Sequence, residues 1–303
     1  MRTYEYVITP EHQGQMIKGF LRQQGYSTRI MTRLKTDPQG ILLNGAHART
    51  VDLLQPGDRL TITFQEETPA VLALWEEEVP ILYEDRDLLV FDKPSGMPVH
   101  PCRAWQNGTL ANVFAAHLAQ QGEEGTFRAL NRLDRDTTGT VLVAKNPFAA
   151  NRLSGTFEKE YVGVVQGRLD PPRGTVDAPI ARENPQGLKR CVSPHGQRAV
   201  THYQVVAVGE DCSLVAFRLE TGRTHQIRVH MSYLGHPLAG DPLYGGSCGL
   251  LERQGLHCRW VRFVHPLTGQ EQQVVAPLPP DLCSLFPQGT QALERMEQAA
   301  EEK

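Results

Sequence analysis

The sequence contains no CxxC pair, and its six cysteines are scattered along 303 residues. Such spacing argues against a disulfide framework and against a thiolate zinc site. No apolar stretch approaches the ~18 residues of a membrane-spanning helix, and the opening MRTYEYVITP lacks the apolar core of a signal peptide. We therefore expect a cytoplasmic protein, without membrane association and with reduced thiols.

Familiar metal and nucleotide motifs are also missing. There is no HExxH pattern, and His225, His230 and His236 are spaced by five and six residues, which does not place them on one helical face. The glycine-rich YGGSCG lacks the Lys-Ser/Thr pair of a phosphate-binding loop. The sequence thus predicts no metal site and no cofactor.

Strong net charge is absent as well, since 31 Lys plus Arg face 34 Asp plus Glu, a balance of −3. By segment, residues 1–66 carry +2, residues 67–80 carry −4, and residues 81–303 carry −1. One short segment therefore sets the sign, and net charge alone decides nothing about a nucleic-acid partner.

That acidic segment, ETPAVLALWEEEVP, contains two prolines and follows a strand-like alternation at Leu60, Ile62 and Phe64. We interpret residues 67–80 as an interdomain linker. Upstream, apolar residues at helical spacing predict two short helices, and Asn44-Gly45 predicts a tight turn between strands. Residues 1–66 are expected to form a small α+β domain.

Beyond the linker, β-branched and aromatic runs alternate with Gly and Pro breaks, as in GTVLVAKN, KEYVGVVQG, AVTHYQVVAVG and CSLVAFRLE. This spacing favours one large mixed or antiparallel sheet over regular βαβ repeats. We expect an α+β domain over residues 81–287. An amphipathic helical tail is expected over residues 288–303.

The segment ALNRLDRDTTGTVLVAKN carries the most chemical information. Asp134 lies between Arg132 and Arg135, and opposite charges this close keep a carboxylate ionised. An ionised carboxylate is available as a nucleophile. Taken alone, however, RLDR fits a surface turn with salt bridges better.

The segment NRLDRDTTG resembles the HRLDRxTSG signature of the RluA/RluD-type, large-subunit ribosomal pseudouridine synthases. The likeness continues in order through LYEDRDLLVFDKPSGMPVHP, KEYVGVVQG, LETGRTHQIRVHMSYLGHPLAGDPLYGG and LHCRWVRFVHPLTG, over about residues 80–268. In residues 1–65, SxR, GILLNG and LQPGDRLTI resemble the S-four-type RNA-binding domain. The resemblance implies a pseudouridine synthase fold, with a large mixed or antiparallel central sheet and flanking helices, preceded by a small α+β RNA-binding domain.

The resemblance also implies the reaction: isomerisation of specific uridines in structured RNA to pseudouridine, by base flipping and without a cofactor. It favours ribosomal over transfer RNA, and we expect a monomer. Asp134 would be the catalytic carboxylate. Attack on the uracil ring, attack on the sugar, and a route through proton loss from the sugar all stay open at this point.

Individual roles follow from the same motifs. Arg132 would fill the gap left by the flipped uridine, Tyr161 would stack on the uracil and handle a proton, and Arg223 would pair with Asp134. Two positions depart from the family pattern, because Asn131 stands where histidine is usual and Thr138 where serine is usual. Threonine keeps the hydroxyl, whereas asparagine cannot titrate.

Further basic residues are candidates for phosphate contacts. Lys189 and Arg190 lie in a Gly- and Pro-rich stretch, and Arg29 and Arg33 lie on a helix of the first domain. For each of them an ordinary solvated surface charge is a comparable interpretation.

Two other functions compete with this one. A catalytically silent RNA-binding or ribosome-assembly factor on the same fold would not need Asp134, Tyr161 and Arg223 together. A nucleoside hydrolase could also use one carboxylate, but no second placed acid is evident to activate water.

Overall fold

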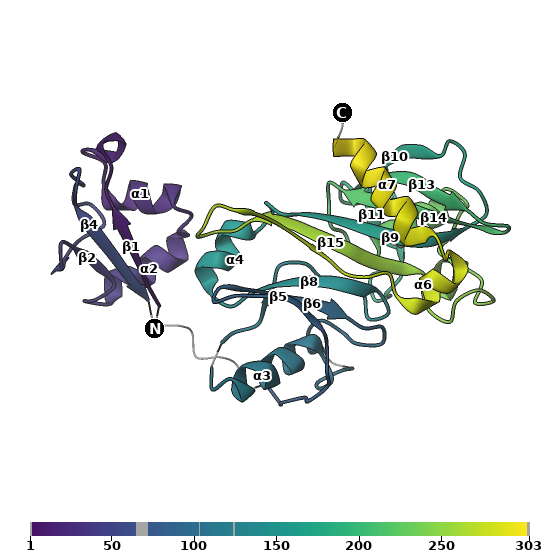
Figure 1. Cartoon of the computed structure of the whole chain (residues 1–303), viewed down its shortest axis with the longest axis horizontal. Coiled ribbons are helices and arrows are strands. Elements are labelled where there is room, and N and C mark those ends of the chain that lie inside the picture. The colour runs from purple at the N-terminus through teal and green to yellow at the C-terminus, as the bar shows by residue number, and fades with distance from the viewer. Residues whose placement is uncertain (1, 65–71, 103, 124, 302–303) are drawn as a thin grey trace.

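The computed structural model describes residues 2–64, 72–102, 104–123 and 125–301. They form a small N-terminal unit and a larger unit built on one long sheet, which lie side by side in Figure 1. No helix in the described part of the chain is long and apolar enough to cross a membrane.

The N-terminal unit packs two helices on a four-stranded sheet. Ser27 precedes the second helix, and its side chain accepts a hydrogen bond from the backbone N–H of Ile30 at 3.3 Å, which caps that helix. Positive φ angles at Asn44 and Gly45 form the expected tight turn. The sheet order is β1-β4-β2-β3. The elements are β1 (Arg2–Val7), α1 (Ile17–Gln23), α2 (Thr28–Thr36), β2 (Ile41–Leu43), β3 (Ala46–His47) and β4 (Arg59–Phe64).

A side chain from the larger unit completes the core of the N-terminal unit. Phe148 lies in α4 (Pro147–Leu153), is 2% exposed, and has its ring centroid 4.8 Å from that of Tyr26 and 5.0 Å from that of Tyr4. Arg152 of the same helix donates to the carbonyl of Gln23 at 3.3 Å. The two units are therefore docked through α4.

The larger unit is a ten-stranded mixed sheet, which confirms the expected fold class. Its main path runs β10-β13-β14-β9-β15-β8-β6-β5, with β16 on β15 and β7 on β8. Strands β8 and β15 are parallel and the other pairs are antiparallel. The strands are β5 (Ile81–Glu84), β6 (Leu88–Lys93), β7 (Arg128–Ala129), β8 (Thr138–Ala144), β9 (Glu158–Gln166), β10 (Arg173–Asp177), β13 (Val200–Val208), β14 (Cys212–Leu219), β15 (Leu256–Val264) and β16 (Glu271–Val275).

Helices cover both faces of this sheet (Figure 1). Alternation along β9 sends Tyr161 to the face packed by α3 (Leu110–Gln120) and α5 (Gln226–Tyr233). It sends Val162 to the other face, where α6 (Pro280–Leu285) and α7 (Gly289–Glu301) pack. Within α7, Leu293 is fully buried and Glu297 pairs with Arg259 at 3.1 Å, so this tail is docked.

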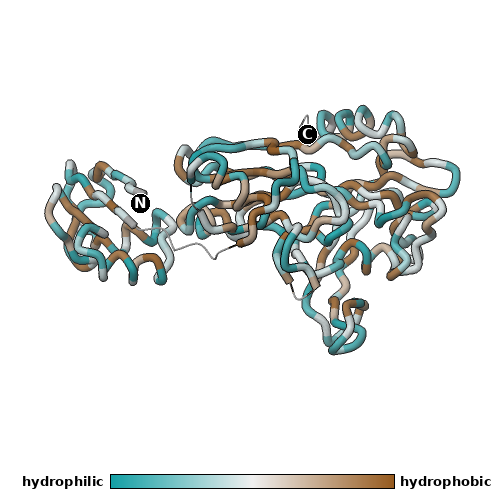
Figure 2. The backbone as a smooth tube through the Cα atoms, turned by 90° about the horizontal axis from the view of Figure 1, so that it is seen from below, coloured by the Kyte–Doolittle hydropathy of each residue, from teal (hydrophilic) through white to brown (hydrophobic). Residues whose placement is uncertain are grey.

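Part of the segment interpreted as a linker lies against the larger unit; residues 67–71 are outside the described ranges. The side chain of Asn112 in α3 donates to the carbonyl of Ala73 at 2.8 Å, and Val79 is buried in the core beneath α3. Figure 2 shows hydrophobic segments along the strands inside each unit and hydrophilic segments in the outer loops.

Candidate active site

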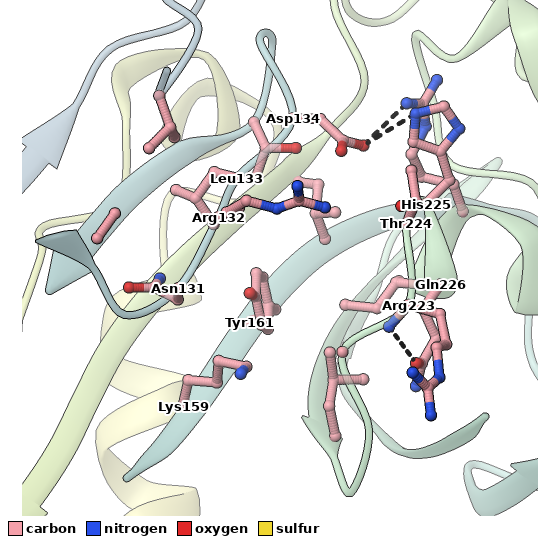
Figure 3. Close-up of a pocket in the computed structure, with 18 of the residues that line it drawn as sticks. Asn131, Arg132, Leu133, Asp134, Lys159, Tyr161, Arg223, Thr224, His225 and Gln226 are labelled. Atoms are coloured by element: carbon pink, nitrogen blue, oxygen red, sulfur yellow. Dashed lines mark hydrogen bonds and ion pairs between the residues drawn. The ribbon is translucent and has the colours of Figure 1, made fainter. Parts of the chain in front are cut away.

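An open cleft of about 730 Å³ lies on the α5 face of the sheet. Its charged lining consists of Arg132, Lys159, Arg223 and Arg228 against the single carboxylate of Asp134. Tyr161 also lines it (Figure 3). The cleft is thus positively charged although the whole chain carries −3, and it suits a negatively charged substrate.

Asp134 lies in a tight turn between β7 and β8. The backbone N–H of Thr137 donates to the carbonyl of Asp134 at 3.1 Å. From beneath, the fully buried Lys93 donates from Nζ to the carbonyls of Pro94, Met97 and Arg135 at 2.7, 2.8 and 2.9 Å. Burial lowers the pKa of Lys93 to about 7. Its amino group fastens the turn that carries Asp134 to the DKPSG segment.

The Thr-Gly pair after the turn allows two backbones to approach closely. Gly139 has a φ of +106°, and a Cβ at this position would collide with the backbone of Cys258 on the adjacent parallel strand β15. The hydroxyl of Thr138 lies 2.9 Å from Nδ1 of His257. Threonine therefore supplies the hydroxyl that this position uses.

Asn131 has a structural role in this fold. Its side chain donates to the carbonyl of Thr140 and accepts from the backbone N–H of Leu142, both at 2.9 Å, and the residue is 4% exposed. The amide thus anchors the strand before the turn to β8. Since an asparagine makes both bonds at once, this geometry needs no titrating group.

The carboxylate of Asp134 is paired with an arginine. Nη1 of Arg228, in the first turn of α5, lies 2.9 Å from Oδ2 of Asp134. The same guanidinium makes a bidentate pair with Asp241, at 2.7 and 2.8 Å, and Asp241 is 1% exposed. A guanidinium held this way is fixed in orientation and holds the Asp134 carboxylate in a defined position.

The expected pairing of Arg223 with Asp134 is therefore wrong. Arg223 precedes α5, its backbone N–H donates to Oε1 of Gln226, and its Nε donates to the carbonyl of Arg198, both at 3.0 Å. Figure 3 shows Arg223 beside Gln226, while Asp134 points toward His225. Arg223 lies five residues before Arg228 and outside α5, so the two side chains point to different places. Only Arg228, which is within the helix, faces Asp134 and Asp241.

His225 lies between the ion pair and Tyr244. It has a left-handed φ of +58°, its Nε2 lies 3.8 Å from Oδ2 of Asp134, and its Nδ1 lies 2.8 Å from the hydroxyl of Tyr244. Burial lowers the pKa of His225, so the ring is neutral near pH 7. Backbone strain at such a position is typical of functional sites.

Tyr161 forms the floor of the cleft and is 6% exposed. Burial raises its pKa well above the ordinary value, and the adjacent thiol of Cys258 and the charge of Asp134 act in the same direction. Tyr161 is therefore a neutral phenol over the working pH range. Burial therefore disfavours the phenolate form of Tyr161.

The phenol of Tyr161 should stay protonated between about pH 7 and about pH 9.5. We therefore expect its contribution to kcat to be the same across this range. The measurement compares the kcat of the wild type and Tyr161→Phe across this range on the same RNA. Their ratio should stay constant. A ratio that climbs with pH would show that the phenolate takes part.

Comparisons with known proteins match this arrangement. Residues 87–233 match the family model of RNA pseudouridylate synthase. The chain is 43% identical over 277 residues to "Uncharacterized RNA pseudouridine synthase YjbO" of Bacillus subtilis, covering 89% of this chain and 98% of that protein. The chain belongs to the RNA pseudouridine synthases. It is thus an isomerase of the RluA/RluD type.

A further relative and a solved structure are also similar to this synthase. It is 35% identical over 307 residues to "Ribosomal large subunit pseudouridine synthase D" of Pseudomonas aeruginosa, covering 94% of this chain and 91% of that protein. The solved structure "Human RNA Pseudouridylate Synthase Domain Containing 1" superposes with a TM-score of 0.56 at 28% identity, covering 70% of this chain and 87% of that chain. The synthase fold is thereby shown.

The basic residues predicted outside the cleft lie in two places. Lys189 pairs with Glu183 at 3.1 Å, and Nη1 of Arg190 bonds the carbonyls of Gly187 and Leu188, within the hairpin of β11 (Ile180–Arg182) and β12 (Arg190–Val192). Arg29 and Arg33 of α2 line a separate cavity of about 320 Å³ against α4. The synthase cleft itself contains neither pair.

One group of potential metal ligands occurs among the described residues of the synthase: Asp85, Asp87 and His265. The Asp85 carboxylate already accepts the backbone N–H groups of Asp87 and Leu88 at 2.7 Å, and it also bonds His265 at 2.8 Å. None of the three lines the cleft. These contacts describe a structural network that anchors the turn before β6.

Proposed function

We propose that this synthase isomerises uridine in large-subunit ribosomal RNA, with Asp134 as the catalytic carboxylate. The observation that carries the proposal is the Asp134–Arg228 pair at 2.9 Å in a cleft with four basic side chains. Relatives whose names specify the ribosomal large subunit favour that RNA over transfer RNA.

The isomerisation sets what the cleft must accomplish. The bond between C1′ and N1 breaks, the uracil rotates, and a bond forms between C1′ and C5. C5 then loses its hydrogen and N1 gains one, so atoms balance with no added reactant. In our proposal Asp134 acts on the bound uridine while Arg228 keeps its carboxylate oriented. Tyr161, directly below in the floor, supports the ring by stacking.

A uridine reaches this cleft only after it leaves the base stack. Arg132 is exposed at the cleft and precedes Asp134 by two residues, so we propose that its guanidinium occupies the vacated space. Arg223 is exposed on the opposite wall, and we assign it to RNA contact in place of the carboxylate pairing predicted for it. Lys189 and Arg190 extend this contact along the hairpin.

The N-terminal unit, residues 1–66, is proposed to be an S-four-type RNA-binding domain whose α2 contacts phosphates through Arg29 and Arg33. Its docking on Phe148 would set the distance between those contacts and the cleft. We further propose that the enzyme acts as a monomer in the cytoplasm. The absence of any paired cysteine among the described residues fits a reducing compartment.

Removing these two arginines is expected to reduce the salt dependence of binding. For Arg29→Gln and Arg33→Gln, the slope of log affinity against log salt should fall in magnitude by about 0.7 to 0.9 for each phosphate that is no longer neutralised. The assay is RNA binding at several salt concentrations. Arg49→Gln, 79% exposed and outside the α2–α4 cavity, is the control. If the variant with both Arg29→Gln and Arg33→Gln showed the wild-type salt slope, the phosphate contacts would be contradicted.

The substrate assignment is tested by mapping pseudouridine in total RNA from cells with and without the gene. We expect one or a few large-subunit ribosomal positions to lose the modification. Loss confined to transfer RNA would overturn the substrate assignment while leaving the reaction intact.

A further inference from the structure

We propose that Trp105 is a stacking platform for an unpaired nucleobase of the RNA substrate, next to the uridine that enters the cleft. The inference rests on the proposed RNA substrate and adds a binding residue at the edge of the cleft. It follows from the exposure, support and electrostatic surroundings of the indole.

The backbone around Trp105 is tied to the cleft wall. Cys102, which lines the cleft, and Trp105 exchange backbone hydrogen bonds of 2.8 and 3.0 Å. The side chain of Gln106 also donates to the carbonyl of Cys102 at 2.9 Å. These bonds fix the position of Trp105 through its main chain. The residue as a whole is 42% exposed.

The indole is also held beside the catalytic turn. The guanidinium of Arg135, the residue after Asp134, lies 5.6 Å from the centroid of the Trp105 ring. Arg135 is itself oriented by a two-point pair with Asp136, both distances being 3.0 Å. A cation is attracted to the face of an aromatic ring, and this attraction favours the observed orientation of the indole. Trp105 stays 42% exposed as a residue with Arg135 in this position.

The contrast with the other tryptophans argues against a purely structural indole. Trp260 is 1% exposed and donates from Nε1 to Glu160 at 3.1 Å. Trp75 has the same 42% exposure as Trp105, but its Nε1 donates to Glu77 and its ring lies against Gly108. Trp75 is thus anchored through its ring, whereas the bonds that hold Trp105 use its backbone.

The surroundings select a nucleobase as the occupant. Four basic side chains and one acid line the adjacent cleft, a charge balance that attracts the phosphate backbone of the proposed RNA substrate. Flipping a uridine into this cleft removes a stacking partner from its neighbours. Arg132 is assigned to the vacated space, and the exposed Trp105, bonded to the cleft-lining Cys102, offers a flat surface to a neighbouring unpaired base. An aromatic platform accepts any base because every base has an aromatic face.

The test compares Trp105→Leu, which keeps an apolar side chain without an aromatic ring, with Trp105→Phe, which keeps a ring. The probe is an unmodified transcript of large-subunit ribosomal RNA. We expect Leu to raise the KM by about 5- to 150-fold, the range of one base stacked on an aromatic ring. The kcat of Trp105→Leu should change little. Trp105→Phe should have a KM close to that of the wild type.

Intrinsic fluorescence provides a second measurement that needs no turnover. Binding of the transcript should quench the emission of Trp105. The quenched component should be present in the wild type and in Trp75→Phe, and absent from Trp105→Phe. Trp75→Leu is the matched control for exposure and should leave the KM unchanged.

An unaltered KM in Trp105→Leu, or a fluorescence component that RNA does not quench, would overturn the stacking proposal. Equal losses in Trp105→Leu and Trp105→Phe would do so too, because the ring would then be irrelevant. Quenching by RNA in a wild-type protein that converts no uridine would instead contradict the proposed function and leave the stacking interaction standing.

Discussion

Asp134→Asn is expected to reduce pseudouridine formation by about 10⁴-fold or more, the scale on which enzymes respond to the loss of a nucleophile. The substitution preserves the shape of the side chain but removes the charge and the nucleophilic oxygen. The turn should persist, because Lys93 and Thr137 hold it through backbone groups. Binding of RNA should therefore change little.

The matched control for this experiment is Asp136→Asn. Asp136 is the other carboxylate of the same turn, but it pairs with Arg135 and does not line the Asp134 cleft. Pseudouridine yield and RNA affinity would be measured for both variants on one transcript. Substantial turnover by Asp134→Asn, or an equal loss in Asp136→Asn, would rule out the role assigned to Asp134.

Arg228→Met is expected to lower both activity and stability. It removes the partner of Asp134 and leaves Asp241, 1% exposed, without its bidentate ion pair. Breaking one side of a buried ion pair costs about 3 to 5 kcal/mol of folding free energy. Loss of one group that positions or stabilises charge at an active site lowers kcat by about 10²- to 10³-fold.

Arg228→Lys and Arg223→Met separate these effects. Lysine keeps a positive charge between the two carboxylates without the planar fork, so it should retain the fold and lose activity. Arg223→Met should leave the melting temperature unchanged, because Arg223 bonds the carbonyl of Arg198 and not Asp134. It should raise the KM, because Arg223 is assigned to RNA contact. Kinetics and thermal unfolding of the three variants are the measurements. A larger kcat loss in Arg223→Met than in Arg228→Met would favour Arg223 as the functional partner of Asp134.

The sequence predicts the elements with strong local patterns. The helical spacing of Ile30, Met31 and Leu34 marks α2, and the apolar runs mark β8, β9, β13 and β14, as found. Strand β1 is not predicted, because RTYEYV is short and begins at the chain terminus without a preceding turn signal. Its pairing with β4 joins segments more than fifty residues apart, which local patterns do not encode.

The site is predictable where motif and position coincide. Asp134, Tyr161, Arg132 and Arg223 all line one cleft, as their motifs suggest. The choice between the two arginines in TGRTHQIR is not predictable in this way, because only the start of α5 after the left-handed residue decides which side chain faces Asp134.

The buried lysine of the site escapes sequence reasoning for a related reason. In DKPSG, Lys93 looks like an ordinary surface charge before a turn. Its role depends on three carbonyl groups, and one of them, that of Arg135, lies forty-two residues further along the chain. Only the completed fold brings these acceptors together around one amino group.

We expect this protein to move the glycosidic bond of uridine in RNA from N1 to C5. This expectation is tested most directly by incubating the purified protein with a large-subunit ribosomal RNA transcript that carries tritium at C5 of uridine. We predict tritium release to solvent in step with pseudouridine formation, without free uracil and without added cofactor. Absence of tritium release, or release of free uracil, would contradict the account.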